Sequence, residues 1–394
     1  MLIDDIKALS SEIAEDVIRI RRHMHRNPEL SFEETETQSF IRSELEKIGI
    51  DEIKTCANTG LVAMIRGNNP DKKTIALRGD IDALPIQEEN DVEYKSQNAG
   101  VMHACGHDVH TSSLLGTALI LQRFREHFEG SVKLIFQPGE EKLPGGASLM
   151  IKEGVLKDPD VISIVGQHVM PLLDAGQIGF RSGMYMASAD EIYIKVSGKG
   201  GHGAHPHMNI DPIAISAQLI TGLQQVISRN AKPSIPSVLS IGRIEGYGST
   251  NVIPDEVNMQ GTFRTFDEEW RDRAHALIVE YCEGIVSSMG AKCEVEVRKG
   301  YPHLKNDETI TEAMKSAAVE YVGEENVIDL EIWPAGEDFA FYSQEIPATF
   351  YRLGTRNREK GIDAMLHTPR FNIDEEALKI GPGLMAWLAI TQLQ

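Results

Sequence analysis

The pattern of hydrophobic and polar positions divides the chain into three stretches. Short apolar runs alternate with segments of helical periodicity up to about residue 186, and this alternation resumes beyond residue 301. Strands that alternate with helices favour a mostly parallel sheet covered on both faces. The expected strands are Leu61–Ile65, Thr74–Leu77, Val132–Phe136, Val161–Val165 and Thr349–Leu353. The expected helices are Thr35–Ile48, Val109–Phe124, Gly146–Lys152, Thr309–Val322 and Glu375–Gln392.

The first 28 residues are amphipathic and predict a single helix. Its apolar positions are Ile3, Ile6, Leu9, Ile13, Val17 and Ile20. This segment lacks the uninterrupted apolar run of a secretory signal, and no stretch of the chain approaches the length of a transmembrane helix. We therefore expect a cytoplasmic protein with no membrane partner.

Between residues 187 and 300 the pattern changes to strand, helix, strand, strand, helix, strand. The six expected elements are Glu191–Ser197, Pro212–Ser228, Val238–Ile244, Val257–Thr265, Glu268–Met289 and Lys292–Arg298. This order is self-contained and resembles a ferredoxin-like unit. The sequence thus predicts an α/β domain formed by residues 1–186 and 301–394, interrupted by a smaller α+β domain at 187–300.

Composition agrees with a soluble protein of two domains. At 394 residues and 43.6 kDa the chain is too long for one ordinary core. Its net charge of −20 argues against binding to nucleic acid or to an anionic membrane surface. The four cysteines show no disulfide framework spacing, which suits a reducing cytoplasm.

The richest chemical segment is Met102–His110, which reads MHACGHDVH. Cys105 and His107 are separated by one glycine, so a loop lets both side chains converge on one metal. An apolar run follows, which places the motif where a loop enters a helix. The unpaired N–H groups and the dipole of that helix end favour Cys105 as a thiolate, the form that binds metal.

Further carboxylates and imidazoles follow the ends of other predicted strands. They are Asp80 and Asp82 after Thr74–Leu77, Glu140 and Glu141 after Val132–Phe136, His168 after Val161–Val165, and His367 in a loop ahead of the last helix. In an open parallel sheet, ligands bind beyond the carboxyl ends of the strands. Charged groups gathered repeatedly at one sheet edge are costly unless a cation compensates them, so these residues indicate a metal site.

Nine motifs in order carry a resemblance to a known family. They are RGDIDALP, MHACGHDVH, FQPGEE, GQHVMP, GKGGHGAHP, NVIP, GTFRT, AGEDF and LHTP. Together they resemble the M20 metallopeptidase superfamily, and more narrowly its amidohydrolase branch of hippurate hydrolases, N-acyl-amino-acid deacylases and auxin-conjugate hydrolases. The motifs run from Asp80 to His367. The resemblance implies a zinc-peptidase-like α/β domain interrupted by a lid through which two chains form a homodimer.

The resemblance also implies one or two divalent metal ions per subunit. Their ligands would be Cys105, His107, Glu141, His168 and His367. Cys105 would bridge, with His107 and His168 on one ion and Glu141 and His367 on the other. The chain departs from the peptidase branches at Asp80, where they carry a ligating histidine, so a single ion is an alternative. Thiolate and imidazole ligands favour zinc, while the carboxylate also accepts manganese, cobalt or nickel.

The remaining roles follow from the same resemblance. Glu140 would be the general base that activates the metal-bound water and returns the proton to the leaving nitrogen. Asp82 would orient a metal ligand or this carboxylate. His202 would reach the active site of the partner subunit and stabilise the oxyanion. The substrate would be held by Asn251, by Arg264, whose guanidinium suits a carboxylate, and by the loop at Gly336.

These residues predict a metal-dependent amidohydrolase that cleaves N-acyl amino acids into a carboxylic acid and a free amino acid. The alternative enzyme is a dipeptidase or a carboxypeptidase-like peptidase on the same scaffold. A metal-binding protein without catalysis is a third reading, and the presence of Glu140 argues against it. No GxGxxG motif follows an early strand, which argues against a dinucleotide-dependent oxidoreductase.

Overall fold

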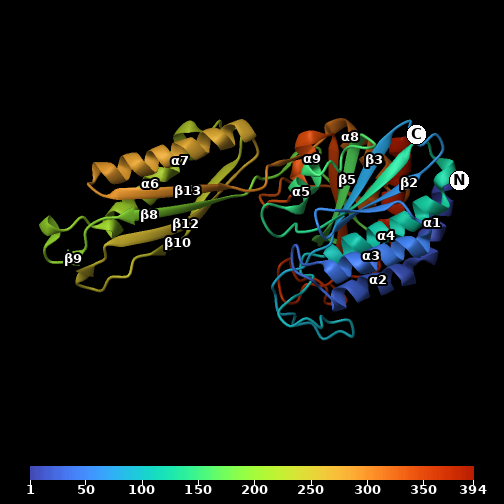
Figure 1. The fold of residues 1–394 in the computed structure, drawn as a ribbon, viewed down its shortest axis with the longest axis horizontal. Helices are drawn as coiled ribbons and strands as arrows, with labels where there is room; N and C mark the ends of the chain where they lie inside the picture. The colour runs from blue at the N-terminus through green and yellow to red at the C-terminus, as the bar shows by residue number, and fades with distance from the viewer. The chain divides into compact units, whose positions relative to one another are not determined.

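The computed structural model describes residues 1–394, and the chain divides into two compact units (Figure 1). Unit 1 comprises residues 1–184, 305–332 and 338–394, and unit 2 comprises residues 185–304 and 333–337. Short strands β7 (Gly183–Met186) and β14 (Leu304–Asn306) cover the points where the chain passes between the units. None of the helices combines the length and the apolar character needed to cross a membrane.

Unit 1 is built on an eight-stranded sheet with the order β1-β2-β4-β3-β5-β16-β6-β15. These strands are β1 (Ile53–Cys56), β2 (Gly60–Arg66), β3 (Thr74–Asp80), β4 (Ser131–Gln137), β5 (Val161–Asp174), β6 (Ile178–Phe180), β15 (Val327–Asp329) and β16 (Ala348–Arg356). The central strands β4, β3, β5 and β16 run parallel, and antiparallel pairing is confined to β1–β2, β2–β4 and β16–β6. The predicted mostly parallel sheet is therefore confirmed.

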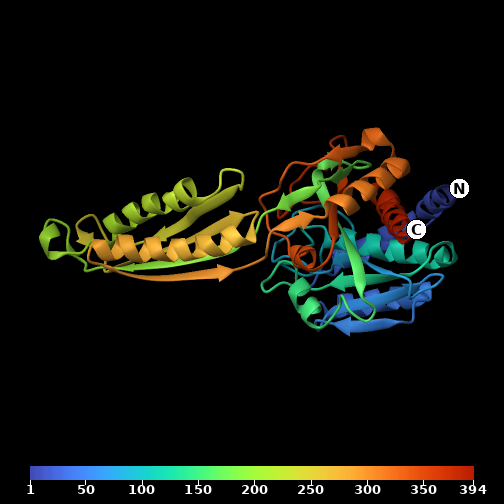
Figure 2. The same cartoon turned by 90° about the horizontal axis from the view of Figure 1, so that it is seen from above.

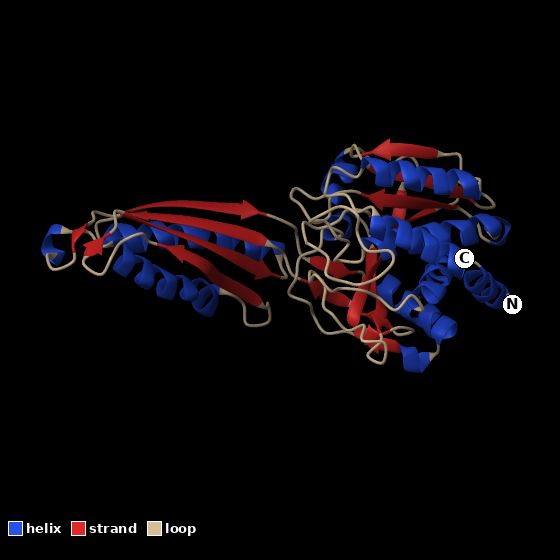
Figure 3. Cartoon of the chain, turned by 90° about the horizontal axis from the view of Figure 1, so that it is seen from below, coloured by secondary structure: helices blue, strands red, loops and turns tan.

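Helices cover this sheet on both faces, and as a result every residue of β3 and β4 is buried. The helices of unit 1 are α1 (Leu2–Glu12), α2 (Ala14–Arg26), α3 (Thr35–Ile48), α4 (His107–Arg123), α5 (Gly146–Lys152), α8 (Glu308–Val322), α9 (Ala340–Glu345) and α10 (Ala377–Leu393) (Figure 3). Helices α4 and α10 contact β3, whereas α5 contacts β4 and α8 contacts β16. The hydrophobic core lies between these layers.

The prediction of one amino-terminal helix is wrong, because the helix breaks at Ile13. The backbone there has φ −85° and ψ −2°, which ends α1 and starts α2. Both halves keep their apolar stripe buried, through Ile6 on one side and Val17 on the other. They bury it mainly against different partners, since α1 packs mostly on α10 and α2 mostly on α4. The break lets one amphipathic segment follow two neighbouring helices.

Unit 2 is a four-stranded antiparallel sheet covered by two helices (Figures 1 and 2). Its main elements are β8 (Asp190–Ser197), α6 (Pro212–Asn230), β10 (Ser237–Glu245), β12 (Glu256–Thr265), α7 (Glu268–Ser288) and β13 (Lys292–Lys299). The spatial order β10-β12-β8-β13 is that of a ferredoxin-like unit. Buried and exposed residues alternate along β8, so one face of the sheet packs on the helices.

Unit 2 begins two residues before and ends four residues after the expected limits of 187–300, and it includes one further segment. Trp333–Glu337 was assigned to the larger domain but belongs to unit 2. The backbone of Trp333 pairs with this unit, donating to Tyr185 O at 2.8 Å and accepting from Ala187 N at 3.2 Å. Such pairing between residues far apart in sequence leaves no mark on local periodicity. As a result Gly336 lies in unit 2.

Candidate active site

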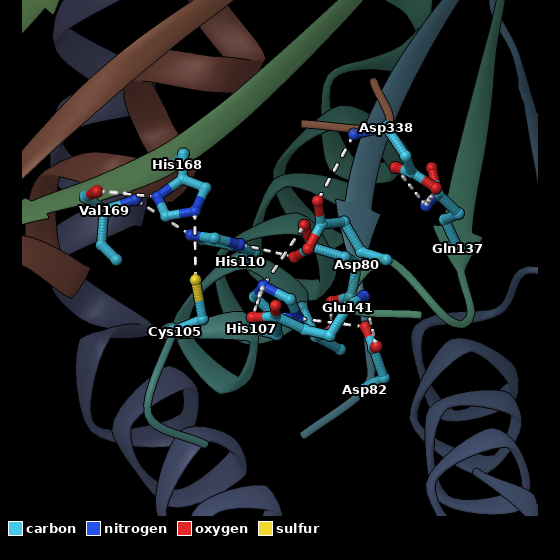
Figure 4. A network of polar contacts seen from close by, with 12 residues as sticks. Asp80, Asp82, Cys105, His107, His110, Gln137, Glu141, His168, Val169 and Asp338 are labelled. Atoms are coloured by element: carbon cyan, nitrogen blue, oxygen red, sulfur yellow. Dashed lines mark hydrogen bonds and ion pairs between the residues drawn. The ribbon is translucent and has the colours of Figure 1, made fainter. Parts of the chain in front are cut away.

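The sheet of unit 1 brings the predicted metal-binding residues together at one edge (Figure 4). Asp80 ends β3 and Asp82 follows it, Glu140 and Glu141 follow β4, Cys105 precedes α4, His107 opens α4, His168 lies in β5, and His367 lies in the loop before α10. His168 was expected after its strand, but β5 continues to Asp174. The pairing of β5 with β3 ends at Gly166, so His168 lies just beyond the part of β5 that pairs with β3.

Cys105 lies between two histidines that come from distant parts of the chain. Its Sγ is 3.5 Å from Nε2 of His168 and 3.3 Å from Nε2 of His367. Nδ1 of His168 lies 2.7 Å from the carbonyl oxygen of Val169, to which it donates. That bond leaves Nε2 of His168 with a free lone pair facing the sulfur, which is the form that binds a metal.

His107 carries a buried nitrogen without a hydrogen-bond partner, and the carboxylate of Glu141 lies beside it. Nδ1 of His107 pairs with Oδ1 of Asp82 at 3.1 Å, while its Nε2 has no hydrogen-bond partner. Oε1 of Glu141 lies 4.0 Å from that Nε2 and 3.2 Å from Nε2 of His367. A buried nitrogen without a hydrogen bond is costly and rare, so Nε2 of His107 beside the carboxylate of Glu141 points to a cation between them.

Two candidate metal sites meet at Cys105. One consists of Cys105, His107 and His168, and the other of Cys105, Glu141 and His367, with the ligand atoms of each group within 4.8 Å of one another. Sulfur, imidazole nitrogen and carboxylate oxygen suit zinc and related divalent ions. The residues present therefore fit one or two divalent metal ions, as the sequence predicted.

The sequence predicted a thiolate at Cys105, but the surroundings of this side chain favour the neutral thiol. Burial and the charges of Glu141, Glu140 and Asp80 raise the pKa of its thiol well above the ordinary value. Helix α4 begins at His107, so Cys105 lies outside its first turn and the helix end acts weakly on it. Ionisation of Cys105 thus requires the metal itself.

The same carboxylates act in the opposite direction on His107. Burial alone would lower the pKa of this histidine, but Asp80, Asp82 and Glu141 outweigh burial and raise the pKa to about 10. At His168, burial and the charge of Arg352 outweigh the charge of Asp80 and hold the pKa well below the ordinary value. Without metal, His107 is protonated and His168 is neutral near pH 7.

Arg78 and His110 explain how an aspartate is accommodated at position 80. Nη1 of Arg78 lies 2.6 Å from Oδ2 of Asp80, and Nδ1 of His110 lies 2.5 Å from Oδ1. The backbone N–H of Val169 donates to Nε2 of His110 at 2.9 Å, so Nδ1 carries the proton and donates to Asp80. The sequence did not predict that Arg78 and His110 bind Asp80, although both residues lie inside the motifs RGDIDALP and MHACGHDVH.

Glu140 lies beside the metal-binding groups and is 7% exposed. Its carboxylate is within 4.8 Å of ligand atoms of His107 and Glu141. The backbone N–H of Asp338 lies 3.4 Å from Oε1 of Glu140. Asp82, in turn, accepts from Ser31 Oγ at 2.6 Å and from the backbone N–H of Glu141 at 3.0 Å, so it connects the loop of Glu141 to His107.

In unit 2, His202 and Asn251 lie on paired segments. His202 ends β9 (Gly201–His202), which pairs with β11 (Val252–Ile253), and Gly203 N donates to Asn251 O at 2.8 Å. His202 is exposed, and its Nδ1 accepts from Ala204 N at 3.1 Å. Nε2 therefore carries the proton and is a donor suited to an oxyanion.

Arg264 lies near the end of β12 in the four-stranded sheet of unit 2, and Gly336 lies beside it. A Cβ on Gly336 would lie 3.4 Å from Nη1 of Arg264, so the glycine leaves the guanidinium open. Glu256 begins β12 at the opposite end of this strand, where it pairs with Ser197. About 25 Å of β12 separates Glu256 from Arg264. Unit 2 thus brings Arg264 to Gly336 and His202 to Asn251, but it keeps the two pairs apart.

Comparisons with known proteins agree with this geometry. The family model described as peptidase family M20/M25/M40 matches residues 76–390. An N-acetylcysteine deacetylase of Bacillus subtilis is 42% identical over 96% of this chain and 97% of its own. Thermostable carboxypeptidase 2 of Saccharolobus solfataricus is 41% identical over 99% of this chain and 98% of its own.

A solved structure gives the same result in three dimensions. A Bacillus subtilis protein described as a dinuclear metal-binding peptidase of the M20 family superposes with a TM-score of 0.83 at 39% identity, covering 97% of this chain and 99% of that one. The match of the family model to most of the chain, the full-length relatives and the shared fold lead to one conclusion. The chain belongs to peptidase family M20/M25/M40.

Proposed function

We propose that the protein is a metal-dependent amidohydrolase that cleaves N-acyl amino acids into a carboxylic acid and a free amino acid. The observation that carries the proposal is the pair of metal-binding groups sharing Cys105, with the carboxylate of Glu140 beside them. The name of the N-acetylcysteine deacetylase relative supports the same substrate class. The assigned metal ligands are Cys105, His107, Glu141, His168 and His367.

The reaction adds water across the amide bond. A bound divalent ion supplies a water of lowered pKa and polarises the carbonyl oxygen. Glu140 takes a proton from the attacking water as the new C–O bond forms, and it gives that proton to the amide nitrogen as the C–N bond breaks. Asp82 holds Nδ1 of His107, which directs Nε2 of that ring to the metal.

The alternative function is that of a peptidase, and the carboxypeptidase relative favours it. A rate screen of N-acyl amino acids and unblocked dipeptides against the zinc- or manganese-reconstituted protein separates the two functions. We expect kcat/KM to be highest for an N-acyl amino acid. Higher kcat/KM for dipeptides with a free amino group would establish the alternative, and turnover of neither class by a metal-loaded protein would contradict both.

Arg264 is proposed to bind the substrate carboxylate. The guanidinium is half-buried, next to Gly336, and its Nε donates to Thr262 Oγ1 at 3.1 Å, which leaves the Nη atoms for a bidentate contact. Arg264→Ala should raise KM by about 10- to 100-fold for substrates with a free carboxylate, given the strength of a charged hydrogen bond. Amides of the same substrates should change little in a steady-state assay, and an equal effect on both would remove this role.

We propose a cytoplasmic homodimer in which His202 and Asn251 serve the active site of the partner subunit. Their separation from Arg264 within one chain supports this arrangement, because a second chain is needed to supply both pairs to one substrate. The edge strand β10 offers a pairing surface, with Val238 45% and Ile244 52% exposed. A reducing cytoplasm keeps the Cys105 thiol available for metal.

Mixing two inactive variants tests this exchange. Glu140→Ala and His202→Ala proteins should each be inactive, and dissociation followed by reassociation should restore about a quarter of all sites. Half of the dimers are then mixed, and each holds one site built from the Glu140 of one chain and the His202 of the other. If subunit exchange is verified by a tag and no activity returns, His202 does not act on a partner's site.

A further inference from the structure

The side chain of Asp338 is completely buried and accepts hydrogen bonds from three segments of unit 1, of which Figure 4 shows the contact with Gln137. Nε2 of Gln137, the last residue of β4, lies 2.8 Å from both carboxylate oxygens. Nη2 of Arg78 on β3 lies 2.8 Å from Oδ1, and the backbone N–H of Ala147 on α5 lies 3.0 Å from Oδ2. These donors fix Asp338 to the two central strands and to the helix that follows the Glu140 loop.

This anchoring has a consequence for the backbone of Asp338. Its N–H points at Glu140 and lies 3.4 Å from Oε1. A side chain fixed on three elements leaves the attached peptide little freedom, so the direction of the N–H is fixed too. A general base needs this constraint, because an error of about 1 Å in its placement costs about 10²-fold in rate.

We propose that Asp338 is a positioning residue for the catalytic base. Gln137, Arg78 and Ala147 hold its side chain, and its backbone N–H holds the carboxylate of Glu140 beside the metal-binding groups. The inference rests on the proposed role of Glu140 as the base. It differs from the substrate-holding role expected for the loop at Gly336, since the carboxylate of Asp338 faces the sheet interior.

The donors around Asp338 require a carboxylate. Both oxygens of Asp338 accept, and each faces more than one N–H. An asparagine at this position has one acceptor oxygen and an NH₂ group that would face another donor. Asp338→Asn therefore keeps the size of the side chain but turns part of its anchoring into repulsion, which lets the peptide rotate.

The first test is a kinetic comparison of Asp338→Asn with Asp374→Asn. Asp374 is also a buried carboxylate of unit 1, and it pairs with Asn357 and Lys360 instead of the groups around Glu140. We expect Asp338→Asn to lower kcat by about 10- to 100-fold, with KM within about threefold and metal content unchanged. Asp374→Asn should retain kcat even if its melting temperature falls. Equal loss of kcat in both variants would overturn the proposal.

A double-mutant cycle tests whether Asp338 acts through Glu140. In a Glu140→Gln background, Asp338→Asn should reduce the residual rate by less than twofold, because the base it positions is already absent. An undiminished loss in that background would overturn the proposal. If Asp338→Asn does not fold, Gln137→Met takes its place, since it removes the donor to both Asp338 oxygens, and the same cycle applies.

The two levels of failure are distinguishable. A metal-loaded protein that turns over neither N-acyl amino acids nor dipeptides contradicts the proposed function, and a Glu140→Gln protein with normal kcat contradicts the role of Glu140 as the base, whatever Asp338 does. A Glu140→Gln protein that is inactive, together with an Asp338→Asn protein of normal kcat and metal content, contradicts only the positioning role.

Discussion

Glu140→Gln is expected to lose about 10²- to 10⁴-fold or more in kcat while it retains substrate and metal. The amide keeps the shape of the side chain and still accepts from the backbone N–H of Asp338. It does not take a proton from water or deliver one to nitrogen, so both proton transfers fail. The measurement is kcat by steady-state assay, with metal content by elemental analysis and substrate affinity by equilibrium binding.

A matched control for this change is Glu153→Gln. Glu153 is an exposed glutamate of the same unit that accepts from the backbone N–H of Ala57 at 2.8 Å and is in none of the metal-binding groups. It should keep near-normal kcat. A Glu140→Gln variant with near-normal kcat would move the role of base elsewhere, with Asp82 as the next candidate.

The cores of the elements were predictable because hydrophobic periodicity identifies what is buried. Gly146–Lys152 was expected as a helix, and α5 has these bounds. The ends of the strands that carry functional residues were predicted less accurately. β3 was expected to stop at Leu77 but continues to Asp80. Arg78 and Asp80 extend it because they neutralise each other at 2.6 Å inside the sheet, and no hydrophobicity pattern reveals such a pair.

The candidate site was predictable as a set of residues, whereas the contacts that hold it were not. The rule that ligands gather at the carboxyl ends of parallel strands pointed to Asp82, Glu141 and His168. Sequence gave no reason to connect Asp338 with Gln137, because this contact joins segments about two hundred residues apart. The protonation of Cys105 likewise depends on carboxylates that only the fold brings close to the sulfur.

Removal of the metal is expected to abolish turnover completely. Chelation followed by dialysis should leave an inactive protein, and Zn²⁺, Mn²⁺ or Co²⁺ should restore the rate. Cys105→Ser should weaken metal retention, because a serine hydroxyl is rarely ionised near neutral pH. Cys293→Ser is the matched control, since this half-buried cysteine of unit 2 should leave metal content unchanged. Full activity in a protein shown to be free of metal would contradict the proposed function.

Metal affinity should rise steeply with pH, and the sign follows from the ligands. Burial and acidic neighbours hold the pKa of the Cys105 thiol above its ordinary value, and the pKa of His107 is about 10. Both groups are therefore protonated between pH 6 and 8 without metal, and both must lose a proton to bind it. His168, whose pKa is lowered, contributes no proton. Calorimetric titration with zinc in buffers of different ionisation enthalpy should show release of two or more protons, because Glu141 also raises the pKa of His367, and a matching increase in affinity with pH. Binding without proton release would contradict the assignment of Cys105 and His107 as ligands.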